Sequence, residues 1–221
     1  MRKLLFPLII GLGGIAVLLW LGFWQMDRLE WKQGVIADIN AKLAEPPVPL
    51  PATPNEADDE YRSVIFEGAA TGQEIRLLDS GTAAGTGHRI ISAFETVDGR
   101  RIMVDQGLLP LYDEQTAPFT GTVTVQGNLI WPDDISEQPP EGDEWYARNV
   151  PAMAQTLGTQ PVMVVLAAAS DYDPRLQPLP VDTRNIKNDH LEYAITWFLL
   201  AVVWLSMTIF YMVRATRRKD D

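Results

Sequence analysis

One histidine is placed where it could bind a metal or a prosthetic group at the edge of a membrane. His190 begins the stretch His190-Leu191-Glu192-Tyr193-Ala194-Ile195-Thr196-Trp197-Phe198, which leads into a long apolar run. On a helix, His190, Ala194 and Trp197 share one face, with Tyr193 beside them. A single imidazole can be an axial ligand of haem iron, with apolar and aromatic groups burying the porphyrin. The alternative is a histidine that only anchors a helix among lipid headgroups.

A second set of candidate residues ends the other long apolar run. Trp24 and Gln25 follow this run directly, and Arg28 comes one helical turn later. In the haem interpretation, Trp24 faces His190 from the other helix, and Gln25 and Arg28 lie just outside the hydrocarbon. An arginine at that depth can pair with haem propionates. In the alternative interpretation it pairs with a lipid phosphate.

The composition narrows the chemistry that this chain of 221 residues can perform. It has two histidines and no cysteine, which excludes metal sites built from several imidazoles, iron–sulfur clusters and thiol catalysis. The net charge of −11 argues against a nucleic-acid partner. The glycine-rich segment 81–87 lacks the lysine of a phosphate-binding loop, and the serines lack a nucleophile-elbow sequence. We therefore expect no enzymatic activity.

Two uncharged runs predict the transmembrane helices that must position these residues. Residues 4–23 and 193–213 are free of charge over 20 and 21 residues, enough to cross about 30 Å of hydrocarbon. Asp189 and Glu192 have the spacing of a capping box, which predicts that the second helix starts there.

Three glycines of the first run, Gly11, Gly14 and Gly22, fall close to one helix face. Small residues on one face admit a neighbouring helix at close range. Glycine is also simply common in membrane helices, so the pattern leaves both explanations open.

Charge at the two ends of the chain predicts its orientation. Basic residues flank both runs on the side of the termini, which the positive-inside rule assigns to the cytoplasm or the matrix. The 168 residues between them carry 12 basic and 27 acidic residues, a net charge of −15. We expect a multi-pass protein of a bacterial inner membrane, with both termini cytoplasmic and the middle periplasmic.

The middle of the chain predicts a mostly antiparallel α+β domain. Strands are expected at residues 61–66, 74–78, 89–96, 101–105, 122–130 and 162–166, with a loop over residues 81–87. Asp98-Gly99 predicts a tight hairpin of type I′. Asn149, Pro151 and Gly158 predict a helix with an N-cap, a proline in its first turn and a glycine after its end.

These elements divide the chain into six parts. We expect an N-terminal transmembrane anchor (1–24), a membrane-proximal amphipathic helix with a proline-rich linker (25–60) and an extracytoplasmic α+β domain (61–182). A return linker (183–192), the second transmembrane helix (193–213) and a basic cytoplasmic tail (214–221) follow. The fold class is thus a membrane α+β protein, in which two transmembrane helices flank a mostly antiparallel domain with one or two helices.

Two motifs resemble the Surfeit locus protein 1 family. Leu21-Gly22-Phe23-Trp24-Gln25-Met26-Asp27-Arg28, followed by Trp31-Lys32, is similar to the first-helix signature of that family. The stretch from His190 to Phe198 is similar to its second-helix signature. In the middle domain the chain departs from the family, with Gln106 and Leu108 where members usually have Arg and Trp.

The resemblance implies an assembly factor for haem–copper terminal oxidases, mainly cytochrome c oxidase. Bacterial members are similar in binding haem a through a second-helix histidine, which corresponds to His190 as axial ligand of the iron. The resemblance further implies contact with oxidase subunit I and with haem a synthase, besides the lipid bilayer. A cofactor-free scaffold that docks oxidase subunits is the alternative. A membrane-bound enzyme is a third possibility, for which the sequence shows no cluster of catalytic groups.

Overall fold

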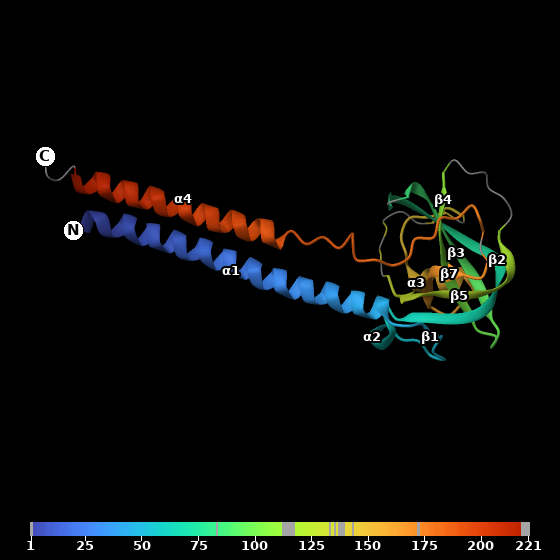
Figure 1. The fold of residues 1–221 in the computed structure, drawn as a ribbon. Coiled ribbons are helices and arrows are strands. Elements are labelled where there is room, and N and C mark those ends of the chain that lie inside the picture. The colour runs from blue at the N-terminus through green and yellow to red at the C-terminus, as the bar shows by residue number, and fades with distance from the viewer. Residues whose placement is uncertain are drawn as a thin grey trace. The chain divides into compact units, whose positions relative to one another are not determined.

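The computed structural model describes residues 2–82, 84–111, 118–132, 134, 136, 140–142, 144–171 and 173–217. These residues form two compact units, a helix pair and a β-barrel domain. The helix pair contains residues 1–38 and 183–221, and the barrel unit contains residues 39–182. Figure 1 shows the elements of both units along the chain.

The helix pair consists of α1 (Arg2–Ala44) and α4 (His190–Arg217). Both are long and apolar enough to cross a membrane, with mean hydropathies of 2.3 and 1.9 over their most apolar windows. The two helices run antiparallel and lie side by side (Figure 1), since residues near the start of α1 contact residues near the end of α4. Gly34 does not interrupt α1, so the amphipathic segment expected after residue 25 is part of the same helix.

Three glycines of α1, Gly11, Gly14 and Gly22, lie where its backbone comes close to side chains of α4. A Cβ atom built on Gly14 would come within 2.5 Å of Trp204 Nε1, and one built on Gly22 within 2.5 Å of Phe198 Cε1. A Cβ atom built on Gly11 would come closer still, to Thr208 Cγ2. The small-residue face of the first helix is therefore a helix-packing face, which decides between the two explanations offered by the sequence.

The second unit contains seven strands and two short helices in its described part. The elements, in chain order, are β1 (Val48–Pro49), α2 (Glu56–Asp59), β2 (Ser63–Thr82), β3 (Gly85–Thr96), β4 (Arg101–Pro110), β5 (Thr120–Ile130), β6 (Glu144–Trp145), α3 (Val150–Leu157) and β7 (Met163–Ala169).

Five of the strands close into a barrel. They pair in the order β2-β3-β4-β7-β5, and β5 returns to β2 to complete the circuit. All of these pairs are antiparallel except β4 with β7. This is the strand order of the small Greek-key barrel known as the OB-fold. The expected mostly antiparallel α+β domain is confirmed, and closure of the sheet removes the exposed edges of these strands.

Alternation along the strands supplies two cores. On β4, Ile102 and Val104 belong to one apolar cluster while Met103 belongs to the other, as the two-residue period of a strand requires. The cluster of Met103 also contains Met153 and Leu157 of α3, so α3 covers one face of the sheet. As predicted, Asn149 caps α3 by accepting from the Ala152 backbone N–H, and Gly158 ends it in the left-handed conformation at φ 62°.

Two local predictions for the barrel were wrong. The strands expected at residues 61–66 and 74–78 are parts of the single strand β2, which continues through Gly68 and bends at an irregularity between Ala70 and Glu74. Most of segment 81–87, expected as a loop, also belongs to strands β2 and β3. A continuous β2 can pair with β5 along its first half and with β3 along its second.

The hairpin at Asp98-Gly99 is confirmed in position but not in type. Gly99 has φ 82°, and its N–H bonds to Thr96 O at 2.8 Å, while Thr96 N bonds to Arg100 O. Tyr61 is the one described non-glycine residue with positive φ, so Asp98 does not adopt the conformation that a type I′ turn requires. The geometry is instead a three-residue loop that ends on a left-handed glycine.

Candidate functional site

His190 lies at the first turn of α4 and contacts α1. Its ring Nδ1 is 2.7 Å from Oε1 of Gln25. The Gln25 side chain is 9% exposed and the imidazole is half-buried. Two residues that are 165 positions apart in the sequence thus form one polar contact between the two apolar helices.

The α4 face that carries His190 continues along the contact with α1. Ala194, one turn later, is 1% exposed, and Ala201 is buried in the same way. Trp197 stands between them and is half-buried. The expected face of His190, Ala194 and Trp197 is therefore turned toward the neighbouring helix.

Two of the predicted site residues are not gathered at this contact. It is Gln25 that meets His190, whereas Trp24, which we expected to face the imidazole, is 44% exposed. Tyr193 is 54% exposed. Neighbouring positions on a helix are rotated by about 100°, so the placement of Gln25 in the contact turns Trp24 toward the outside.

Arg28 lies one turn beyond Gln25 on α1. Its guanidinium carbon is 4.4 Å from the centre of the Trp31 ring, a cation–π arrangement. The positive charge is therefore held close to the surface of α1. Along α1 it lies beyond Gln25, the partner of His190, and so farther from the apolar run 4–23. The arrangement leaves the guanidinium exposed to an anionic group from outside.

A profile of the SURF1 family matches residues 12–202, which include both Gln25 and His190. The chain belongs to the SURF1 family.

Relatives in this family align over most of their length. Surfeit locus protein 1 of Rattus norvegicus is 28% identical, over 89% of this chain and 72% of the rat protein. The Homo sapiens protein of the same name is 28% identical, over 82% of this chain and 69% of its own. A SURF1-like protein of Monosiga brevicollis is 29% identical, over 86% of this chain and 81% of that protein.

Sequence reasoning missed two contacts of the helix pair in this SURF1-family chain. Trp204 Nε1 donates to the Gly11 carbonyl oxygen at 3.1 Å, and the rings of Phe23 and Phe198 meet edge-on with centroids 5.3 Å apart. The sequence contained a pattern that indicates the position of Trp204. His190, Trp197 and Trp204 follow one another at intervals of seven residues. A seven-residue spacing is typical of the seam between packed helices.

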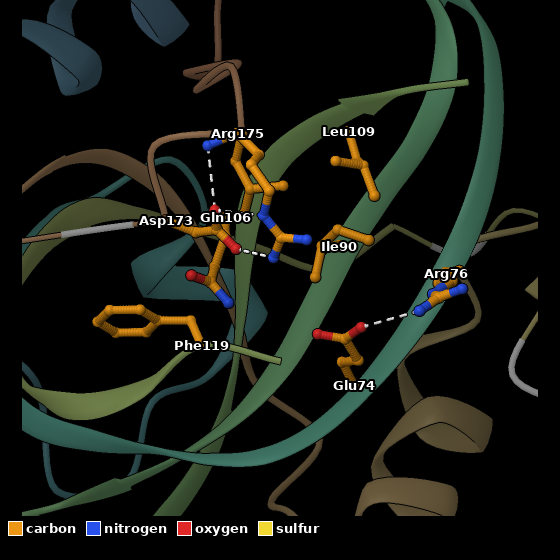
Figure 2. Close-up of a pocket in the computed structure, with 9 residues that line it drawn as sticks. Glu74, Arg76, Ile90, Gln106, Leu109, Phe119, Asp173 and Arg175 are labelled. Atoms are coloured by element: carbon orange, nitrogen blue, oxygen red, sulfur yellow. Dashed lines mark hydrogen bonds and ion pairs between the residues drawn. The ribbon is translucent and has the colours of Figure 1, made fainter. Parts of the chain in front are cut away.

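The barrel holds a small polar cleft. Figure 2 shows two acid–arginine pairs among its lining residues, Glu74 with Arg76 at 3.5 Å and Asp173 with Arg175. Hydrogen bonds from Arg175 hold the pKa of Asp173 below its ordinary value. The cavity has a volume of about 10 Å³, room for about one water molecule. Gln106 lines it and donates to Ser92 Oγ at 2.6 Å.

One ion pair is buried in the barrel unit, with Asp105 at 0% and Arg89 at 9% exposure. Asp105 accepts from the Arg89 guanidinium at 2.7 and 2.8 Å and from the Gly107 backbone N–H at 3.1 Å. Burial raises the pKa of Asp105, and the Arg89 charge opposes that shift. The adjacent His88 is half-buried on β3, as expected of an ordinary strand residue. Among the described residues no group of three His, Cys, Asp or Glu side chains could hold a metal ion.

Proposed function

We propose that this SURF1-family protein is a non-enzymatic membrane assembly factor for a haem–copper terminal oxidase, and that it holds haem a through His190. The observation that carries the proposal is the half-buried imidazole at the contact between two membrane-length helices, with one ring nitrogen bound to Gln25. The resemblance of both helix motifs to the Surfeit locus protein 1 family supplies the oxidase and the haem type.

The residues of the helix pair fit an axially bound haem. Haem iron accepts a single imidazole, which is what this unit offers, because the only other histidine, His88, belongs to the barrel. The α4 face between His190 and Ala201 supplies Trp197 as an aromatic surface. Arg28 offers a cation to a propionate once its contact with Trp31 is exchanged. When bound, the haem is the cargo that the assembly factor transfers.

The partners and orientation follow from the same proposal. Haem a would come from haem a synthase and pass to oxidase subunit I, both in the bilayer. Basic residues at both ends of the chain support cytoplasmic termini, with the barrel in the periplasm of a bacterial inner membrane. In that orientation, Trp24 and Tyr193 lie in the outer headgroup zone, where exposed aromatic residues are typical of membrane helices.

Substitution of the proposed ligand tests the function. The His190→Ala protein, purified from cells that make haem a, should lose its Soret absorption while its circular dichroism and yield match the wild type. Leu191→Ala is the matched control, because Leu191 neighbours the ligand but is 48% exposed. Equal haem content in the wild type and His190→Ala proteins would refute the haem proposal and favour the cofactor-free scaffold.

A further inference from the structure

We infer that Gln25 is a positioning residue that fixes the tautomer of His190 and so makes Nε2 the nitrogen available to a metal. The hydrogen bond itself does not depend on any cofactor. Its consequence for haem rests on the function proposed above.

The chemistry of the two side chains sets the direction of the bond. A glutamine Oε1 atom carries no proton and can only accept. A neutral imidazole carries one proton, on either Nδ1 or Nε2. Since Oε1 lies 2.7 Å from Nδ1, the proton resides on Nδ1, and the Nε2 lone pair remains free. Metal-binding histidines commonly donate their other N–H to such a partner, which fixes both tautomer and ring orientation.

The surrounding packing holds Gln25 in this role. Gly22, one turn before it on α1, is where the helix backbone approaches the Phe198 ring. Ala194, one turn after His190 on α4, is 1% exposed. Close contacts thus lie next to both partners, and the burial of Gln25 limits competition from water for Nδ1.

Nitrogen NMR on the haem-free protein tests the tautomer directly. The chain has two histidines, so a ¹⁵N-histidine-labelled His88→Gln protein in detergent reports His190 alone. At about pH 8.5, where an imidazole is neutral, the proton should be on Nδ1. In Gln25→Leu the signals should shift to a mixture of tautomers, and in Gln25→Glu, which keeps an acceptor, they should return to the Nδ1–H form. Protonation on Nε2 in the wild type, or an unchanged spectrum in Gln25→Leu, would overturn the inference.

A haem titration tests the consequence. Loss of a partner that orients a metal ligand typically weakens metal binding by about 10–100-fold, so the Kd of Gln25→Leu for haem a should rise by that factor. Gln25→Glu should restore tight binding. Gln33→Leu, an exposed glutamine of the same helix, is the matched control and should leave the Kd unchanged. An unchanged Kd in Gln25→Leu would show that the tautomer does not matter for binding.

The two experiments separate this inference from the proposed function. If His190→Ala keeps its haem while the NMR result holds, the proposed function fails and the Gln25 contact stands as a structural one. If His190→Ala loses its haem but Gln25→Leu changes neither spectrum nor Kd, the function stands and the positioning role is wrong.

Discussion

Replacing Gly22 by valine should force the helix pair apart at one turn from Gln25, the partner of His190. The first added carbon would lie within 2.5 Å of Phe198 Cε1, whereas carbon atoms in contact are about 3.5–4.0 Å apart. The Phe198 ring packs edge-on against Phe23, so its retreat sacrifices that contact. The ring or the helix must therefore move by about 1 Å, at a cost typical of overpacking, about 1–3 kcal/mol.

That displacement is large compared with the tolerance of the nearby hydrogen bond. The distance from Gln25 Oε1 to His190 Nδ1 is 2.7 Å. A further separation of about 1 Å would take this distance beyond roughly 3.2 Å, the upper limit of such hydrogen bonds. Gly22→Val should thus weaken haem a binding by about 10-fold or more, although Gly22 is not one of the residues proposed to hold the haem.

A matched glycine makes the measurement decisive. A Cβ on Gly13 meets nothing within 4 Å, so Gly13→Val adds the same bulk to the same helix at no steric cost. Thermal unfolding in detergent and a haem a titration should show both losses for Gly22→Val and neither for Gly13→Val. Equal stability and haem affinity in the two variants would refute the close packing of α1 and α4 at this turn.

Four further predictions concern the barrel and the topology. Asp105→Ala should cost about 3 kcal/mol in a denaturant melt, because the buried Arg89 then keeps only the more distant Asp79 carboxylate, 3.8 Å away, as its counter-charge. Asp134→Ala at an exposed pair should cost less than about 1 kcal/mol. Gly99→Val should lower stability by about 1 kcal/mol or more, because valine resists the positive φ at that turn. Hydrogen bonds from Arg100 and Thr96 lower the pKa of Asp98 from 3.8 to about 2. The ionised carboxylate therefore stabilises the fold above pH 3.8, and this effect is lost as the pH falls toward 2. Melts at a series of pH values should show the stabilities of the wild type and Asp98→Asn converging over that range. A periplasm-specific reporter fused at Asp113, outside the described residues, should be active, and a cytoplasmic signal would contradict the proposed orientation.

The elements predicted correctly are those whose signals are local. Residues 4–23 and 193–213 specify helices by their uncharged length, and Asn149 and Gly158 specify both ends of α3. Barrel closure has no local signal, since it pairs Met103 with Met163, sixty residues later. The strand expected over residues 61–66 continues through Gly68, because neighbouring strands pair with Gly68 on both sides.

The sequence predicted both partners of the polar contact between the helices, Gln25 and His190, but not that they pair with each other. The motifs identified His190 and Gln25, but interfacial aromatic residues suggested Trp24 as the partner of the imidazole. The glycines of the first helix predict the partner of His190 better. Gln25 follows Gly22 by three residues, so it lies on the same face of α1, which packs against α4. Which face of a helix is buried depends on its partner, and single-helix patterns do not specify that partner.

The closed barrel also has an entropic consequence for the contact between Gln25 and His190. In an unfolded chain that contact closes a loop of 165 residues. Once residues 39–182 are one folded body, about 20 residues outside it separate the two partners. With the logarithmic dependence of loop closure on length, this shortening favours the contact by about 2 kcal/mol. Substitutions that unfold the barrel should therefore weaken the pairing of two side chains they never touch.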